Sequence, residues 1–239
     1  MNALITLVRW DAILQARNGF YWATAFVVAA FGALLLNVPE AARADRAAWV
    51  PALLAINLQI TTFFFVAGLI LLERDEGTLT ALAVSPLSPA IYLTARTITL
   101  TTLAAVETIA IVWIVFGADG SWGFILSGTV ALGVTYTGFG AAIGTRYESV
   151  NAMLLPASVF VAALLLPLLP HFGLAPRVLF LLHPTEPALT LIRAGYGSAT
   201  ASDVAFGFVG SIVWGAVAYW CGRRSLAGLM RDTRATGGR

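Results

Sequence analysis

The stretch Trp49-Val-Pro-Ala-Leu-Leu-Ala-Ile-Asn-Leu-Gln-Ile-Thr-Thr-Phe-Phe-Phe-Val-Ala-Gly-Leu-Ile-Leu-Leu72 contains no charged residue. A helix that crosses about 30 Å of hydrocarbon needs about 20 predominantly apolar residues, and this stretch is long enough. It stops at the charged run Glu73-Arg-Asp-Glu76, which is costly to bury in lipid. We therefore predict a membrane-spanning helix that ends next to Glu73.

The whole chain has the composition of an integral membrane protein. Hydrophobic residues make up 59% of its 239 residues, charged residues only 11%, and the mean hydropathy is +0.85. A soluble domain usually carries about 25% charged residues. The basic residues are all Arg, which suggests a GC-rich bacterial genome and hence a bacterial plasma membrane. Residues 1–239 are predicted to form a single all-α, multi-pass membrane domain.

Apolar segments of suitable length recur along the chain and predict six transmembrane helices. A surface helix is expected over residues 2–18, where Arg9 and Asp11 interrupt the apolar run. Ser88 and Pro89 have the residue types of an N-cap and a first helical position, so a long helix should begin there. The predicted spans are residues 20–38, 49–72, 98–117, 122–144, 152–169 and 204–221.

Residues 172–192 are apolar enough for a seventh span, but Pro176, Pro184 and Pro187 interrupt them. With six spans and a cytoplasmic start, most arginines lie on the cytoplasmic side, as the positive-inside rule requires. We therefore predict that both termini are cytoplasmic and that 172–192 forms broken helices at, or dipping partway into, the outer surface. The inside arginines are Arg9, Arg17, Arg74, Arg96, Arg146, Arg223, Arg224, Arg231, Arg234 and Arg239, and the outside ones are Arg43, Arg46, Arg177 and Arg193.

Several classes of function are excluded by missing residue types. A Walker phosphate-binding loop requires a lysine, and this chain has none. The two histidines, His171 and His183, fall in the outer loop without metal-binding spacing. No nucleophile motif is present, and the anionic inner membrane face accounts for the basic C-terminal segment without nucleic acid. No catalytic, cofactor-binding or metal-ligating residue is predicted.

Glu107 is the one acid well inside a predicted span. An ionisable group at this depth suggests a proton relay or a counter-charge for a cationic substrate. The structural alternative is a neutral or paired acid bonded to a neighbouring helix, with Asn57 and Gln59 of the second span as partners. These three residues form the candidate transport path.

The fourth predicted span carries Gly140-Ala-Ala-Ile-Gly144. A G-x-x-x-G pattern lets two helix backbones approach closely. We expect Gly140 and Gly144 to pack within the bundle rather than at a dimer seam.

The segment 73–89 is acidic although it is predicted to be cytoplasmic. Arg74 stands against Glu73, Asp75 and Glu76, so the net charge of the segment is two negative. Because cytoplasmic loops are normally basic, an acidic amphipathic turn suggests docking onto a soluble partner. A solvated hairpin is the structural alternative.

The stretch Glu73-Arg-Asp-Glu-Gly-Thr-Leu-Thr-Ala-Leu-Ala-Val-Ser-Pro-Leu-Ser88 resembles the E-R-x-x-G-T-L-x-x-L-x-V-[ST]-P-L pattern of type-2 ABC exporter permeases. The likeness continues in Leu165-Leu-Pro-Leu-Leu-Pro-His-Phe-Gly173 and in His183-Pro-Thr-Glu-Pro187, which look like the family's end of span five and its broken outer helices. Tyr92-Leu-Thr-Ala-Arg96 is similar to permeases of the fluoroquinolone-export kind.

The resemblance implies that a coupling segment touches a separate ABC ATP-binding subunit, which holds the ATP and Mg²⁺, so that this chain itself is no enzyme and needs no cofactor. It also implies a second permease chain, identical or not, and export of hydrophobic or amphipathic molecules. A proton-coupled secondary transporter using Glu107 and a haem-exporter-type membrane scaffold are the alternatives. The implied coupling residues are Glu73, Arg74, Asp75, Glu76, Gly77, Thr78, Leu79, Leu82 and Pro86.

Overall fold

The computed structural model describes residues 3–85 and 87–237, and every regular element in this part of the chain is helical. The α-helices are α1 (Ala3–Arg17), α2 (Phe20–Leu36), α3 (Glu40–Arg43), α4 (Arg46–Leu58), α5 (Phe65–Asp75), α6 (Thr78–Val84), α7 (Pro89–Phe116), α8 (Trp122–Gly144), α9 (Val150–Leu164), α10 (Leu168–His171), α11 (Glu186–Ala194) and α12 (Ala201–Gly237). A π-helical turn, η1 (Gln59–Phe64), joins α4 to α5, and a 3-10 turn, η2 (Arg177–Phe180), precedes α11.

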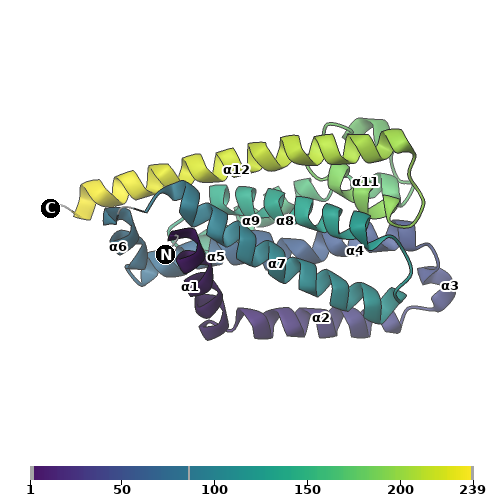
Figure 1. The fold of residues 1–239 in the computed structure, drawn as a ribbon, viewed down its shortest axis with the longest axis horizontal. Coiled ribbons are helices and arrows are strands. Elements are labelled where there is room, and N and C mark those ends of the chain that lie inside the picture. Colours follow the sequence, from purple (N-terminus) through teal and green to yellow (C-terminus); the bar gives the residue numbers. More distant parts are fainter. Residues whose placement is uncertain (1–2, 86, 238–239) are drawn as a thin grey trace.

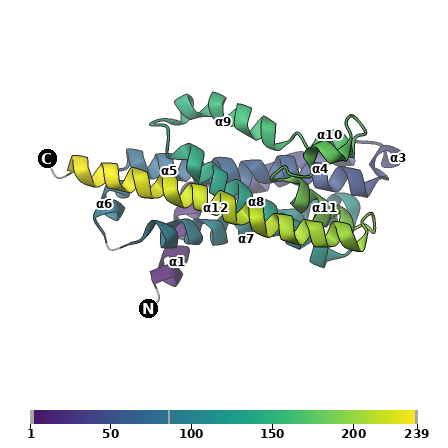
Figure 2. The same ribbon diagram turned by 90° about the horizontal axis from the view of Figure 1, so that it is seen from above.

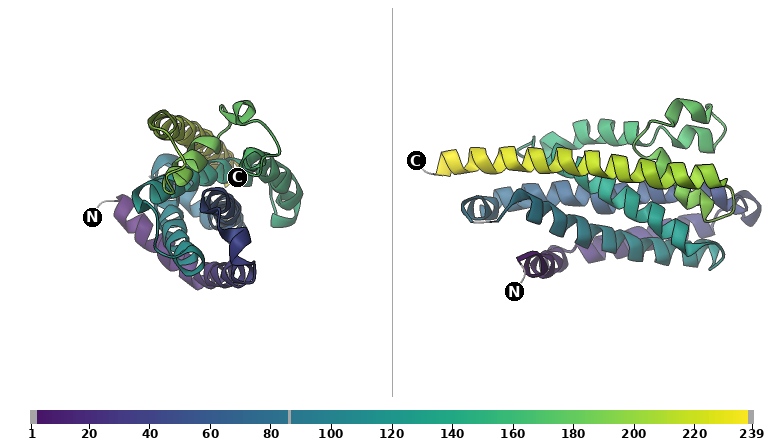
Figure 3. Two further views of the ribbon diagram at one scale, coloured as in Figure 1. Left: turned by 90° about the vertical axis from the view of Figure 1, so that its right-hand side faces the viewer. Right: turned by 45° about the horizontal axis from the view of Figure 1, so that its top comes forward.

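The helices form an elongated bundle in which the longest elements run along the long axis (Figure 1). We call the end that holds α1, α6 and the C-terminal part of α12 the basal end. The distal end holds α3, α10 and α11 (Figures 1 and 2). Helix α9 stands at the edge of the bundle, beside rather than within it (Figures 2 and 3). The N-terminal helix and the end of α12 thus share one end of the molecule.

Four continuous helical stretches are long and apolar enough to cross a membrane. They contain the predicted second, fourth and sixth spans, and the third up to Phe116, one residue short of its predicted end. They are Arg46–Asp75, Pro89–Phe116, Trp122–Gly144 and Ala201–Thr233. Helix α2 is a 17-residue apolar helix that meets α1 at 65°, and Gly19 makes this bend with a positive φ of 75°. With α1 it forms a bent pair that passes the same test of length and hydropathy.

The predicted fifth span, 152–169, is shorter than expected. Helix α9 ends at Leu164 and has 15 residues, about 22 Å at 1.5 Å per residue. Pro167 and Pro170 lack the N–H groups that would extend it, and the chain forms the separate short helix α10 instead. The six-span topology and the cytoplasmic position of the termini stay predictions.

Two other predictions about helix ends can be compared directly with the structure. The Ser88 hydroxyl accepts a hydrogen bond from the Ile91 N–H at 3.2 Å, and Pro89 is the first residue of α7. The predicted start of this helix is therefore confirmed. At the other end of the chain, α12 extends well beyond the predicted span 204–221 on its C-terminal side.

Residues 172–192 are broken as predicted, with η2 and α11 separated by irregular turns. Helix α11 does not lie on the surface, however. All of its residues except Arg193 are buried, and it packs against α4, α8 and α12. The distal end of the bundle is thus closed by a short helix that dips between the longer ones.

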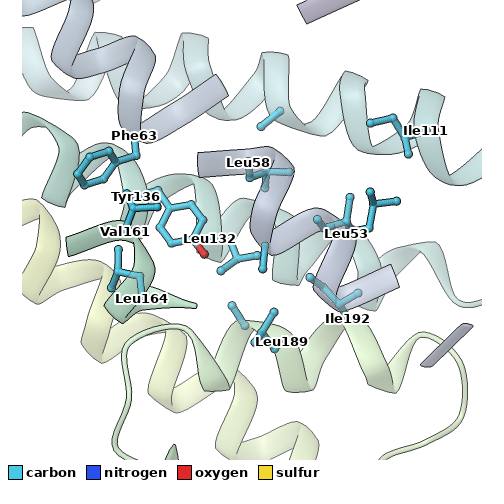
Figure 4. Close-up of a cluster of buried hydrophobic side chains, with 14 of the residues drawn as sticks. Leu53, Leu58, Phe63, Ile111, Leu132, Tyr136, Val161, Leu164, Leu189 and Ile192 are labelled. Atoms are coloured by element: carbon cyan, nitrogen blue, oxygen red, sulfur yellow. The ribbon is translucent and has the colours of Figure 1, made fainter. Parts of the chain in front are cut away.

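The main apolar core is built where α4, η1, α7, α8, α9 and α11 converge (Figure 4). Tyr136 lies among these side chains and brings the one polar atom of the labelled group into the core. Burying each large apolar side chain stabilises the fold by about 1.5–3 kcal/mol relative to water. Within the membrane, close packing takes over much of this role.

Candidate functional site

A buried cluster of polar side chains lies at the basal end, where α1, α5 and α7 meet. The Arg96 guanidinium of α7 forms ion pairs with Asp11 of α1 and Glu73 of α5. The Tyr92 hydroxyl, one helical turn before Arg96, donates to the second Glu73 oxygen. Arg96 is 3% exposed and both acids are 4% exposed. A charge pair this deeply buried holds its helices together, because separating the partners leaves uncompensated charge.

The α1 side of this cluster explains the interrupted apolar face of that helix. The Gln15 amide donates to Asp11 at 3.0 Å and to the Thr99 hydroxyl at 2.9 Å, and Thr99 in turn donates to Asp11. Asp11 and Gln15 are four residues apart and share one face of the helix. That polar face points inward, whereas Trp10 is 61% exposed. We call Asp11, Gln15, Glu73, Tyr92, Arg96 and Thr99 the Arg96 clasp.

The predicted coupling residues divide into an inward and an outward group. The Glu73 carboxylate belongs to the clasp and faces the interior, so it cannot present its charge to a partner. Asp75, the last residue of α5, and Glu76 and Gly77 of the turn that follows are exposed. Gly77 has a φ of 72°, which permits the sharp reversal into α6. The acidic character of this turn on the molecular surface therefore comes from Asp75 and Glu76.

Arg74 connects the same turn to the loop between α8 and α9. Its guanidinium donates to the Tyr147 carbonyl at 3.0 Å and lies 3.6 Å from the Glu148 carboxylate. Glu148 is largely exposed, so the ion pair itself stabilises little. The contact still brings two basal turns that are far apart in sequence side by side.

Helix α6 supplies the remaining coupling residues. Thr78 is exposed at its start, whereas Leu79 is 1% exposed and belongs to an apolar cluster with Tyr92 and Leu226. Leu82 packs against that cluster and lines a cavity of about 300 Å³ between α1, α6 and α7, next to the clasp. Pro86, the last predicted coupling residue, lies outside the described residues.

The structure brings two of the three residues of the candidate transport path together and places the third elsewhere. Glu107 is 1% exposed and faces Asn57 and Thr61 of the second span. Gln59 faces Tyr136 of α8 instead. Residues two apart on a helix point about 200° away from each other, which is why Asn57 and Gln59 do not share a site.

Gly140 and Gly144 face the second span inside the bundle. A Cβ on Gly140 would lie 2.5 Å from the Phe63 carbonyl oxygen in η1, and one on Gly144 would lie 2.8 Å from the Ala67 Cα in α5. The two helix backbones are therefore in direct contact. The close approach that the pattern predicts is made between helices of one chain.

A second group of polar side chains lies at the distal end. Arg177 donates to Glu186 at 2.6 Å, to Asp203 at 2.7 Å and to the Thr190 hydroxyl at 2.7 Å. Glu186 is fully buried, and this desolvation raises its pKa above the usual range although Arg177 opposes the shift. These contacts join η2, α11 and α12.

The two histidines also take structural positions at this end. His183 bonds to the Thr185 hydroxyl and to the Ala163 carbonyl, each at 3.1 Å. Burial, together with the positive charges of Arg193 and Arg177, lowers the pKa of His171 to about 4. His171 is therefore neutral at physiological pH.

Comparison with known proteins defines the class of this apolar helical bundle. The fluoroquinolones export permease protein family matches residues 2–230, so the chain belongs to this family of membrane permeases. Two relatives are fluoroquinolones export permease proteins of Mycobacterium tuberculosis, from strains CDC 1551 / Oshkosh and ATCC 25618 / H37Rv. Each is 28% identical over 242 residues, which cover 100% of this chain and 96% of the relative.

Proposed function

We propose that the chain is the membrane-spanning subunit of an ATP-driven ABC exporter in a bacterial plasma membrane. It moves hydrophobic or amphipathic small molecules, drug-like or lipid-like, out of the cell. It works with a second permease chain and with a separate subunit that binds ATP and Mg²⁺. Its membership in a family named for drug export supports the substrate class.

One observation carries the proposed coupling: the exposed acidic turn at Asp75 and Glu76 follows directly after Glu73, which Arg96 holds. Through Arg96, the turn is connected to α7 and, by way of Asp11, to α1. Breaking a buried ion pair by removing one partner costs about 3–5 kcal/mol. A partner that pushes on the turn therefore moves three helices together rather than bending a loop.

The contact between Arg74 and the α8–α9 loop widens this basal surface. It places residues 146–149 beside the acidic turn, so one partner subunit can touch both segments. A nucleotide-driven movement of that partner then acts on α5 and α9 at once. Such a switch requires contacts that differ between two states of the partner.

The test is co-purification from the native membrane in mild detergent, followed by an ATPase assay of the isolated complex. We compare the native chain with the double variant Asp75→Ala/Glu76→Ala, which leaves the buried Glu73 intact. The matched control is Glu40→Ala/Asp119→Ala, which removes two exposed acids at the distal end. We expect the basal variant to lose the ATPase or its substrate stimulation and the control to keep both. The proposal fails if no nucleotide-binding protein accompanies the native chain.

A second candidate function is favoured by one specific observation. Glu107 is buried without an ion pair among the described residues, which suits a proton-coupled secondary transporter. Such a carrier would export substrate in vesicles that hold a proton gradient and no ATP. Transport that needs ATP and continues after the gradient is collapsed excludes it.

A further inference from the structure

Glu107 and its neighbours form a buried polar group whose hydrogen-bonding capacity is unused. Both carboxylate oxygens of Glu107, both side-chain atoms of Asn57 and the hydroxyl of Thr24 lack a partner among the described residues. Buried polar atoms in folded proteins are nearly always paired, so unpaired ones in one place need an explanation. One explanation is a ligand that supplies the missing donors.

No positive side chain of the described residues compensates Glu107. The ion pairs among the described residues lie at the basal and distal ends of the bundle, and their acids are other than Glu107. The groups that face Glu107 from the second span are an amide and a hydroxyl, Asn57 and Thr61. The site thus offers acceptors and a negative charge, but no cation of its own.

A groove between α2 and α7 reaches this site from the outer face of the bundle. It has a volume of about 710 Å³, and Glu107 lines it together with Leu103 and Val106 of α7. On the α2 side its wall is formed by small residues, among them Ala29 and Gly32. Because both helices are apolar and both faces lie on the outside of the bundle, lipid chains border this groove.

We propose that Glu107 binds the ammonium group of an amphipathic amine whose apolar body lies in the α2–α7 groove. This substrate class deepens the proposed function and rests on it for the direction of transport. The groove falls within the range of about 300–1,000 Å³ that is usual for sites of drug-sized ligands. An ammonium group carries three donors and a positive charge, which match the Glu107 carboxylate and the Thr24 hydroxyl that line the groove.

The first experiment measures binding in the absence of ATP and of any partner. The full chain is placed in nanodiscs of uncharged phosphatidylcholine, so that the lipid does not concentrate cations. The probes are dansylcadaverine, an aromatic body with a primary ammonium, and its analogue with a hydroxyl in place of the amine. We expect the native chain to bind the ammonium probe at least about tenfold more tightly, since charge-assisted hydrogen bonds are worth this much.

Glu107→Gln keeps the shape of the side chain and removes its charge, so it should abolish the tenfold preference. The control Glu40→Gln removes an exposed acid at the distal end and should keep the preference. Equal binding of both probes to the native chain overturns the proposal. So does an unchanged preference in Glu107→Gln, because the carboxyl would then act only as a neutral polar group.

A neighbouring pair of alanines tests the position of the apolar body without touching Glu107. Ala29 lines the groove, whereas Ala30 follows it on α2 and is exposed outside the groove. Ala29→Phe should weaken binding of dansylcadaverine about tenfold or more by filling the groove, and Ala30→Phe should not. Equal affinities in the two variants overturn the proposal, even if Glu107→Gln fails to fold.

The proposal of an amine site at Glu107 and the proposal of an ATP-driven exporter can each be refuted without the other. If the ammonium preference is absent while ATP-driven export is intact, the Glu107 site is wrong and the exporter stands. If the preference is present but no ATPase accompanies the chain, the site stands and the exporter is wrong.

Discussion

Arg96 of α7 holds Glu73 of α5 in a buried ion pair, although a short helix and two turns separate the two residues in sequence. The pair joins the last turn of the second apolar span to the first part of the third. Asp11 shares the same guanidinium, so the N-terminal helix is fixed to the same point. The segment that is predicted to meet a partner subunit is thus anchored in the interior.

Replacing Arg96 should destabilise the protein strongly. Arg96→Gln leaves two buried carboxylates without a cation, and we expect a loss of about 3–5 kcal/mol. The thermal unfolding midpoint in detergent measures it. Arg223→Gln, which alters an exposed arginine of α12, is the control and should unfold close to the native midpoint. Equal midpoints for both variants would show that the clasp adds no stability.

The contact between α8 and η1 should not tolerate one added methyl group. Gly140→Ala places a Cβ 2.5 Å from the Phe63 carbonyl oxygen, so we expect a loss of about 1–3 kcal/mol from overpacking. Gly68→Ala is the matched control, because a Cβ there meets nothing within 4 Å. It should be neutral or stabilise by up to about 1 kcal/mol. A Gly140→Ala variant as stable as Gly68→Ala would contradict the close approach.

At the distal end, two arginines in ion pairs should differ in their contribution to stability. Arg177→Gln leaves the buried Glu186 without its cation and should cost about 2 kcal/mol or more. Arg46→Gln breaks only the exposed pair with Asp119 and should cost less than about 1 kcal/mol. Chemical or thermal unfolding in detergent compares the stabilities of the two variants. A larger loss for Arg46→Gln than for Arg177→Gln would show that the buried Arg177–Glu186 pair is not the stronger contact.

Acid should destabilise the distal end through His171. Its pKa is lowered to about 4 in the folded chain, against an ordinary value of 6.5, so between these values the unfolded chain binds the proton more readily. The stability contribution is therefore complete above pH 6.5 and declines as the pH falls towards 4. By linkage, we expect a loss of about 1–2 kcal/mol between pH 7.5 and pH 5.

His171→Phe keeps an aromatic ring and removes the titration, so its unfolding midpoint should fall less over the same pH range. His183 has a lowered pKa as well, and some acid sensitivity should remain in this variant. A native chain whose midpoint is constant from pH 7.5 to pH 5 would show that His171 does not titrate in this way.

Local patterns predicted the helices best. The charge-free run before Glu73 and the Ser88–Pro89 pair depend on hydropathy and capping, which act within a few residues. Hydropathy alone does not predict that α9 ends at Leu164, because Pro167 and Pro170 lie in a run whose average hydropathy still favours a span. Residues 172–192 were correctly predicted as broken, but their burial depends on neighbouring helices that the segment itself does not encode.

The clasp could not be predicted, because its members come from three separate segments. Asp11 reads as an interruption of an apolar helix and Arg96 as an ordinary cytoplasmic charge. A signal was present in the spacing: Asp11 and Gln15, like Tyr92 and Arg96, are four residues apart and share a helix face. The acidic sequence 73–76 therefore predicts that Glu73 belongs to a partner surface, although its carboxylate faces inward.

The π-helical turn at Gln59–Phe64 fixes the rotational phase of everything that follows it in the second span. A π-helical turn holds one residue more than an α-helical stretch that turns through the same angle, so removing one residue there would let it relax to an ordinary α-helix with little change in the phase of the downstream part. Glu73 would then still face Arg96, and Ala67 would still meet Gly144. A one-residue deletion in a purely α-helical part of the span would instead rotate everything that follows by about 100°, so this segment is the one place in the span where the chain can lose a residue and keep both contacts.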